Sequence, residues 1–312
     1  MPLISVVIPV YKAEDCLQEL YRRLKASLST ITEDFELIMI EDCGGDRSWE
    51  VIGELARNDP RVRGLQFTRN FGQHYGITAG LDYSRGAWVV VIDCDLQERP
   101  EGIPQLYAKA QEGFDVVIAL RHKRKDPWYK RASAYVFYRL FNYLSGMNYD
   151  PDAGNLCIVS RQVVTTFQQM RENLRLFNGL VAWMGYPTAY IRVEHAERFS
   201  GESSYSISKQ LRLATDAIIA YSDRPLRLTI NIGILISMTS FVAGIYYLAH
   251  KLIVGQSIVG WTSLMVSIYF LGGIIISILG IIGIYVGKIF DETKKRPLYL
   301  VSRTTDKIPG KE

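Results

Sequence analysis

Short apolar runs rich in β-branched residues alternate with amphipathic segments along the first part of the chain. The runs cover residues 4–10, 35–40, 62–68, 88–92 and 115–120. Each has the length and composition of a strand that is buried on both faces of a sheet. Apolar residues at helical spacing lie between the runs, over residues 17–28, 49–56, 76–83 and 100–112. This alternation predicts right-handed βαβ units and an α/β fold with a doubly wound parallel sheet.

Two long segments near the carboxyl end contain no charged residue. They cover residues 228–249 and 252–287, and roughly 20 apolar residues in a helix suffice to cross a hydrocarbon core. We therefore expect two spans, with cores at 228–248 and 263–287. The connection between the spans holds only one basic residue, Lys251. More basic residues flank the hairpin, before the first span and after the second: Arg224, Arg227, Lys288, Lys294, Lys295 and Arg296. Because lysine and arginine mark the cytoplasmic side, both ends of this hairpin are predicted to be cytosolic.

The segment before the first span, residues 206–227, is basic and amphipathic. It is typical either of a helix lying in the membrane interface or of a helix that caps the sheet. In the second span, Gly273–Ser277 and Gly283–Gly287 have the spacing that lets helices approach closely, although glycine is common in such helices. The predicted organisation is a cytosolic α/β domain at 1–202, a juxtamembrane helix at 203–227, a hairpin at 228–290 and a cytosolic tail at 291–312.

Composition and missing motifs exclude several classes of protein. With 48% hydrophobic and 22% charged residues, the 312-residue chain is not disordered. Its net charge of +4 is too small to indicate a nucleic-acid partner, and none is expected. The four cysteines lack the spacing of metal ligands. No G-x-G-x-x-G follows the first run and no G-x-x-x-x-G-K-[ST] is present, which disfavours a dehydrogenase and a P-loop NTPase.

Acidic residues follow two of the predicted strands. Asp93 and Asp95 end the fourth strand, and two carboxylates at this spacing repel one another unless a cation lies between them. Hard oxygen ligands favour Mg²⁺ or Mn²⁺, which often bridges to substrate phosphates. Glu41 and Asp42 follow the second strand and can accept hydrogen bonds from a ribose or a uracil, or instead form a helix-capping turn. Because ligands bind at the carboxyl ends of such strands, the two pairs together predict a nucleotide-diphosphate site.

Further motifs accompany these acids. They are Val6-Val7-Ile8-Pro9-Val10-Tyr11, Arg69-Asn70-Phe71-Gly72, Ala79-Gly80-Leu81-Asp82, Asp93-Cys94-Asp95-Leu96-Gln97 and Arg198-Phe199-Ser200-Gly201-Glu202-Ser203. In this order, and with two spans after them, the chain resembles glycosyltransferase family 2. Within that family it is similar to the polyisoprenyl-phosphate glycosyltransferases, the group of dolichol-phosphate mannose synthase and bactoprenol glucosyltransferase. The resemblance covers nearly the whole chain and implies a GT-A (Rossmann-like) catalytic domain.

The resemblance also implies an activity and roles for particular residues. It implies inverting transfer of a sugar from a nucleotide-sugar to a polyisoprenyl phosphate, expected to be undecaprenyl phosphate, with Mg²⁺ or Mn²⁺. The implied location is a bacterial inner membrane, with a multi-pass protein and a cytosolic catalytic domain. Family members with such spans can be tetramers, and the oligomeric state stays open. The implied roles are nucleotide binding by Pro9, Tyr11, Glu41, Asp42 and Asp93; metal binding by Asp93 and Asp95; catalysis by Asp95, Gln97 and Asp152; and acceptor-phosphate binding by Arg121, Arg124, Arg131 and Arg198.

Two segments depart from the family pattern. The usual Asp-x-x-Asp-Phe-Arg reads Asp152-Ala153-Gly154-Asn155-Leu156-Cys157, and the usual Ser-Lys-Tyr reads Ser203-Ser204-Tyr205. Asn155 lacks the carboxylate that accepts a proton, which leaves a base role to Asp152 or to no residue. A phosphate monoester has a second pKa of ~6 and is largely dianionic at neutral pH, so it can attack without a base. The sugar and the nucleotide base stay open.

Two other functions fit parts of the sequence. A different membrane-bound family 2 enzyme would use another lipid-linked or polysaccharide acceptor. Processive synthases of that kind carry Gln-x-x-Arg-Trp, whereas Gln168-Gln169-Met170-Arg171 is followed by Glu172. A membrane-anchored scaffold with a degenerate site is the alternative without enzyme activity. It is disfavoured because it would hold the acids and arginines together in a cleft without a ligand, which is costly.

Overall fold

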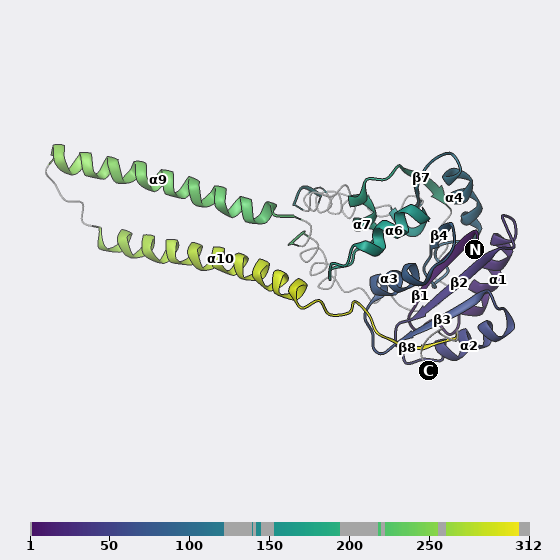
Figure 1. Cartoon of the computed structure of the whole chain (residues 1–312). Helices are drawn as coiled ribbons and strands as arrows, with labels where there is room; N and C mark the ends of the chain where they lie inside the picture. Colours follow the sequence, from purple (N-terminus) through teal and green to yellow (C-terminus); the bar gives the residue numbers. More distant parts are fainter. Residues whose placement is uncertain are drawn as a thin grey trace. The chain divides into compact units, whose positions relative to one another are not determined.

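The computed structural model describes residues 2–121, 139, 142–144, 153–193, 218–219, 222–254 and 260–305. The chain forms two compact units. The sheet unit comprises Met1–Arg139, Met147–Ser206 and Arg296–Glu312, and the helical unit comprises Leu140–Gly146 and Ile207–Lys295. The sheet and its covering helices belong to the first unit, and two long helices belong to the second (Figure 1).

The described part of the sheet unit contains one eight-stranded sheet in the order β7-β5-β6-β4-β1-β2-β3-β8. The strands are β1 (Ile4–Val10), β2 (Phe35–Glu41), β3 (Val62–Phe67), β4 (Trp88–Val91), β5 (Val116–Arg121), β6 (Ala153–Ser160), β7 (Thr188–Val193) and β8 (Val301–Thr304). The helices are α1 (Leu17–Leu28), α2 (Ser48–Asn58), α3 (Gln73–Tyr83), η1 (Pro100–Gly102), α4 (Ile103–Ala110), α6 (Arg161–Gln169) and α7 (Phe177–Met184).

The five predicted strands are confirmed as β1 to β5, and all five run in the same direction, but the sheet as a whole is not entirely parallel. The sheet is mixed, because β6 runs antiparallel to both β4 and β5, and β8 runs antiparallel to β3. The strands β6, β7 and β8 were not predicted. Their sequences, AGNLCIVS, TAYIRV and VSRT, include polar residues and lack the long apolar runs of the first strands.

Both faces of the central strands β1 and β2 are buried, which explains their continuous apolar runs. Ile4, Val6 and Ile8 pack in one core with α1, α2 and α4. The intervening Val7 faces α3, on the opposite side, where α6 and α7 also pack (Figure 1). The result is a three-layer α/β/α arrangement that leaves the ends of the strands open for a site.

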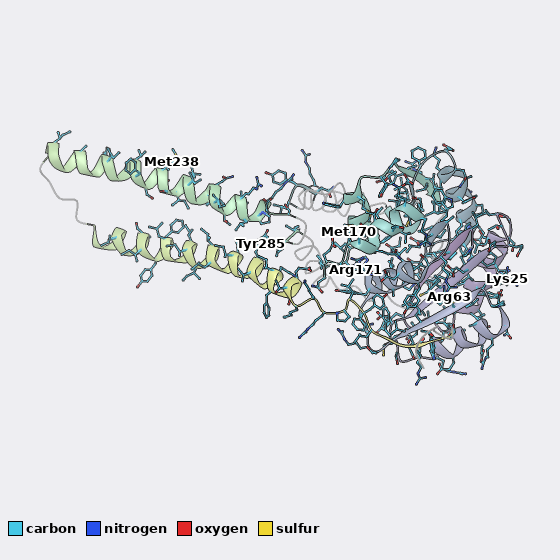
Figure 2. All side chains as sticks on the ribbon, in the orientation of Figure 1. Lys25, Arg63, Met170, Arg171, Met238 and Tyr285 are labelled. Atoms are coloured by element: carbon cyan, nitrogen blue, oxygen red, sulfur yellow. The ribbon has the colours of Figure 1, made fainter. Side chains whose placement is uncertain are left out.

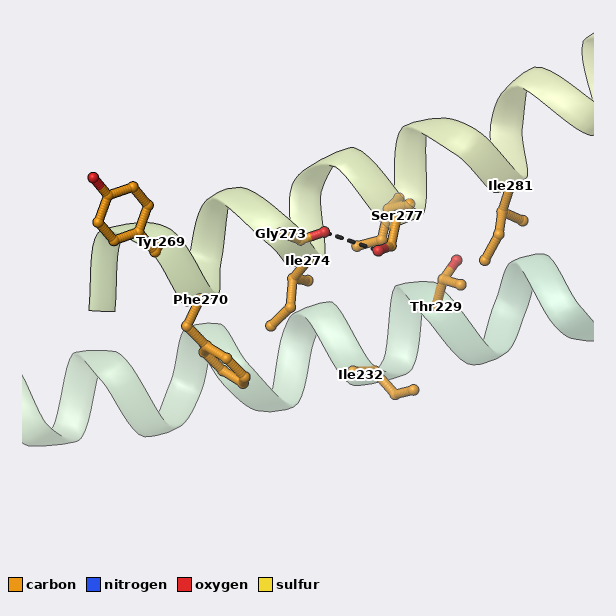
Figure 3. A pocket seen from close by; sticks show the side chains of 9 residues that line it. Thr229, Ile232, Tyr269, Phe270, Gly273, Ile274, Ser277 and Ile281 are labelled. Carbon is orange, nitrogen blue, oxygen red and sulfur yellow. Dashed lines mark hydrogen bonds between the residues drawn. The ribbon is translucent and has the colours of Figure 1, made fainter. Parts of the chain in front are cut away.

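The helical unit contains α9 (Arg224–Val254) and α10 (Trp261–Thr293). Both contain a segment long and apolar enough to cross a membrane, at Arg224–Tyr246 and Val266–Thr293, with mean hydropathies of 1.9 and 2.3. Apolar side chains project outward along both helices, including Met238 on α9 (Figure 2). Between the helices lies a groove of 460 Å³ that includes Ile232 of α9 and Phe270 of α10 (Figure 3).

The segment after α10 rejoins the sheet. There β8 pairs with β3 at the edge of the sheet, within a stretch predicted from sequence as a cytosolic tail. Tyr299 donates a hydrogen bond to Asp82 at 2.8 Å and stacks on Phe67 with 5.4 Å between ring centroids. The backbone N–H of Gly64 donates to the Thr305 hydroxyl at 2.7 Å. These contacts fix the chain that follows the second long helix onto the sheet unit.

Two helical glycines provide a matched test of the packing of helices against the sheet. A Cβ at Gly80 of α3 would lie 2.2 Å from Val7 and 2.9 Å from Ile40, whereas a Cβ at Gly53 of α2 would meet nothing within 4 Å. We expect Gly80→Ala to lower the free energy of unfolding by about 1–3 kcal/mol through overpacking. Gly53→Ala should raise it by about 0.5–1 kcal/mol through helix propensity. Urea unfolding of detergent-solubilised protein measures both values, and shifts of the same sign would contradict this account.

Candidate functional site

The candidate site lies where the strand order changes direction. From β1 the chain adds β2 and β3 on one side, and then β4 on the other. Open α/β sheets bind ligands in the crevice that this reversal opens at the carboxyl ends of the strands. Val7 of β1 aligns with Val91 of β4, and Val10 aligns with Glu41 of β2. The segments that follow β1, β2 and β4 therefore meet at one edge, as the sequence predicts.

The backbone at this edge is strained. Three of the four non-glycine residues with positive φ in the described part of the chain lie here: Lys12 (51°), Cys43 (55°) and Leu96 (60°). They follow β1, β2 and β4, respectively. A non-glycine residue in this conformation costs about 1–3 kcal/mol, and such strain clusters at functional sites. The strain is an indication of function that is independent of the acidic motifs.

Asp93 is held by two side-chain amides. Gln73, the first residue of α3, donates from Nε2 to Oδ1 at 2.6 Å, and Asn155 of β6 donates from Nδ2 to Oδ2 at 2.7 Å. Each amide must present its nitrogen here, because an ionised carboxylate only accepts hydrogen bonds. Sequence reasoning missed both partners. For Asn155, the only signal in the sequence was that the family pattern has an acidic residue at this position.

Asp95 and Gln97 lie on the turn that follows β4. The Asp95 carboxylate accepts the backbone N–H of Gln97 at 3.1 Å. Between the two aspartates, Cys94 packs against the core, and its carbonyl oxygen accepts a hydrogen bond from the Cys16 thiol at 3.0 Å. Leu96 is buried. Core contacts on both sides of Asp95 therefore fix the turn that carries it.

Glu41 and Asp42 are buried, and both hold neighbouring loops. Glu41 accepts the Gly44 N–H at 2.6 Å and the Gln66 amide at 3.1 Å. Asp42 accepts the N–H groups of Phe71 and Gly72 at 2.7 and 2.8 Å. Burial raises the pKa of Asp42, while these two N–H groups oppose the rise. The pair thus shapes the loops that border the site, in addition to the nucleotide contacts predicted from sequence.

The other predicted site residues are distributed unevenly. Tyr11 is 46% exposed, with the Lys12 ammonium 5.6 Å from the centre of its ring. Pro9 is buried in β1 and faces Gly76 of α3. Arg121 is the last residue of β5. Asp152, Arg124, Arg131 and Arg198 lie outside the described residues.

His74 lies beside Gln73 in the first turn of α3. Its Nδ1 atom is buried without a hydrogen-bond partner among the described residues. Burial, together with the positive charge of Arg175, lowers the pKa of His74 to about 4. The imidazole is therefore neutral at physiological pH, and protonating it would put a second positive charge beside Arg175.

Among the described residues, no group of three or more His, Cys, Asp or Glu side chains is arranged to hold a metal ion. Two carboxylates are nevertheless a suitable donor set for Mg²⁺ or Mn²⁺, because these ions are commonly bound by one or two carboxylates together with substrate phosphates. Asp93 and Asp95 therefore fit a cation that is shared with a diphosphate.

A mixed α/β sheet with acids at its switch point is the architecture of GT-A glycosyltransferases. The family model named Glycosyl transferase family 2 matches residues 5–168. The chain belongs to this family, and it is a glycosyltransferase.

Relatives match the chain over nearly its whole length. The uncharacterized glycosyltransferase YkcC of Bacillus subtilis (strain 168) is 40% identical over 301 residues, which are 96% of this chain and 93% of that protein. The prophage bactoprenol glucosyl transferase homolog of Escherichia coli (strain K12) is 36% identical over 301 residues, 96% of this chain and 98% of that protein. The bactoprenol glucosyl transferase of Shigella phage SfV is 35% identical over 305 residues, with coverages of 97% and 99%.

Solved structures share the fold at low sequence identity. Glucosyl-3-phosphoglycerate synthase from Mycobacterium tuberculosis superposes with a TM-score of 0.51 and 15% identity, over 70% of this chain and 76% of that chain. That structure is a complex with Mn²⁺, uridine diphosphate and phosphoglyceric acid. The likeness supports the GT-A fold.

The low pKa of His74 predicts a pH-dependent stability. Between pH 6.5 and about 4, the unfolded chain binds a proton that the folded chain does not, so stability falls as the pH falls. Relative to His74→Gln, the wild type should lose up to about 2 kcal/mol of unfolding free energy between pH 7 and pH 5. Urea unfolding of both proteins at the two pH values measures the free energies of unfolding. Subtracting the loss in His74→Gln from the loss in the wild type cancels the contributions of all other titrating groups. An equal loss in both proteins would show that His74 does not resist protonation.

Proposed function

We propose that this glycosyltransferase transfers a sugar from a nucleotide-sugar to a polyprenyl phosphate at the cytoplasmic face of a membrane, with Mg²⁺ or Mn²⁺. The observation that carries the proposal is the placement of Asp93 and Asp95 at the switch point of the sheet. The lipid acceptor is supported by full-length relatives that are named bactoprenol glucosyl transferases.

The donor half of the site would act on the leaving diphosphate. Breaking the anomeric C–O bond leaves negative charge on that group, and a bound divalent cation stabilises the charge where it develops. Asp93 and Asp95 would hold this cation. Tyr11 offers an exposed aromatic face to the base, Glu41 and Asp42 support the surrounding loops, and Gln97 would lie near the sugar.

The acceptor half of the site needs positively charged side chains more than it needs a general base. The phosphate of a polyprenyl phosphate is already largely dianionic at neutral pH, with a second pKa of ~6. Its oxygen can therefore attack the anomeric carbon directly, in a step that inverts the configuration. Arginine side chains bind phosphate in a bidentate manner, and Arg121, Arg124, Arg131 and Arg198 are the proposed acceptor ligands. Asp152 is the remaining candidate for a base.

The helical unit supports a membrane location. The apolar side chains of α9 and α10 are largely exposed, for example Phe241 at 71% and Tyr269 at 77%. Helices that are apolar on all sides are typical of membrane spans. In addition, a single sheet contains both the strands that precede α9 in the chain and β8, which follows α10. Both ends of the hairpin must then lie on the same side of the bilayer, as the distribution of basic residues also indicates.

Replacing Asp95 tests the donor site. Asp95→Asn keeps the shape of the side chain but removes the negative charge that binds the cation, so we expect the metal-dependent transfer activity to be lost. The measurement is mass spectrometry of the glycolipid formed from undecaprenyl phosphate, Mn²⁺ and a panel of nucleotide-sugars. Full activity of the variant would remove the cation-binding role, and absence of any glycolipid from the wild type would remove the proposed acceptor.

The hairpin topology can be tested with the thiols of the chain. Cys43 is exposed in the sheet unit, and Gly260 precedes α10 at the tip of the hairpin. In intact cells, a membrane-impermeant maleimide should label Gly260→Cys but not the wild type. After permeabilisation the wild type should also become labelled, at Cys43. Labelling of the wild type in intact cells would contradict a cytosolic sheet unit.

A further inference from the structure

We propose that Asn155 is a positioning residue which, together with Gln73, orients Asp93 and makes cation binding depend on the nucleotide donor. This inference rests on the proposed function and deepens it. A departure from the family pattern would thereby acquire a role. An amide at this position orients a ligand without adding a further carboxylate.

The strand register brings Asn155 to Asp93. Cys157 of β6 aligns with Val91 of β4 in antiparallel pairing. Asp93 lies two residues after Val91 and Asn155 two residues before Cys157, and their side chains meet at 2.7 Å. A residue at this point of an antiparallel pair has a direct cross-strand neighbour. The contact therefore depends on the register of β6 on β4 and on the segment that continues beyond the end of β4 at Val91.

Gln73 reaches the other oxygen of the same carboxylate from a different element. The loop before α3 is held by Asp42, which accepts the N–H groups of Phe71 and Gly72. Gln73 follows directly and donates to Asp93 at 2.6 Å. With one amide on each oxygen, the direction of the Asp93 carboxylate is set before a ligand arrives.

The main chain at Asn155 is fixed as well. Its N–H donates to Glu98 Oε1 at 2.7 Å, and Glu98 is only 5% exposed. At the preceding Gly154, a Cβ would lie 2.7 Å from the same Glu98 oxygen and 3.2 Å from the carbonyl oxygen of Ala119. Glycine at this position therefore leaves room for the carboxylate to reach the backbone. Asn155 is thus joined to the β4–α4 connection twice, through Glu98 and through Asp93.

The chemical neutrality of position 155 matches its surroundings. An aspartate there would place its carboxylate against Asp93 and close to Glu98. Two residues along β6, where the family pattern has an arginine, Cys157 is buried, and burial raises the pKa of its thiol so that it stays uncharged. Like charges in contact disfavour ionisation unless a cation lies between them. Asn155 and Cys157 therefore form a neutral pair where the family pattern has a charged one.

The experiment compares wild type, Asn155→Ala and Asn155→Asp as full-length proteins in detergent. Free Mn²⁺ is titrated by electron paramagnetic resonance, with and without uridine diphosphate as the probe. The wild type should bind Mn²⁺ more tightly when the probe is present. Loss of a hydrogen-bonding partner of a metal ligand commonly costs about 10–100-fold in affinity, so Asn155→Ala should weaken Mn²⁺ binding in the presence of the probe by this factor. Asn155→Asp should bind Mn²⁺ without the probe at least ~10-fold more tightly than the wild type, because a further carboxylate joins the site.

Asn58 is the matched control, since it is exposed at the end of α2. Asn58→Ala and Asn58→Asp should leave Mn²⁺ binding unchanged, and unfolding midpoints check that every variant is folded. Wild-type affinity in both Asn155 variants, or Mn²⁺ affinity in the wild type that is independent of the probe, would overturn the inference. Asp95→Asn in the same titration distinguishes a failure of the Asn155 inference from a failure of the proposed donor site. If it abolishes Mn²⁺ binding while the Asn155 variants have no effect, the proposed donor site stands and the role of Asn155 falls.

Discussion

Buried and half-buried carboxylates at one edge of a sheet are the constraint on which the rest of this structure depends. An ionised carboxylate away from water is costly unless hydrogen-bond donors or cations surround it. Glu41, Asp42 and Asp93 each accept hydrogen bonds from two of the described residues, and these bonds join the ends of β2 and β4 to the neighbouring loops and elements. The strained residues Cys43 and Leu96 lie in the same loops, which indicates that local strain is compensated by these bonds and by core packing.

The second constraint is the return of the chain to the sheet after α10. A four-residue strand, β8, is too short to be stable alone, but Tyr299 and Thr305 reinforce its pairing with β3. Since β8 belongs to the same sheet as the strands that precede the helices, the chain leaves one sheet before α9 and returns to it after α10. For the proposed membrane hairpin, this topology would require both ends to lie on one side of the bilayer, without any reference to the charges that flank the helices.

Much of the fold could be predicted because both faces of the central strands are buried. Such strands need continuous apolar runs, so β1 to β5 are visible in the sequence. In β6, by contrast, Gly154 and Asn155 interrupt the pattern, and their identities are required by Glu98 and Asp93. Long-range contacts of this kind leave no local periodicity, and the antiparallel direction of β6 was missed for the same reason.

The sequence by itself determined the two apolar helices and the edge of the sheet at which the acids lie, because local composition and periodicity encode these features, and the resemblance of its motifs to glycosyltransferase family 2 indicated the class of enzyme. Only the tertiary structure decided which neighbours each acid has. Asp93 meets amides from residues 20 and 62 positions away, and these partners are brought together by the register of β6 on β4 and by the placement of α3. Hydrogen bonds between distant residues depend on the packing of whole elements, and a linear pattern does not record that packing.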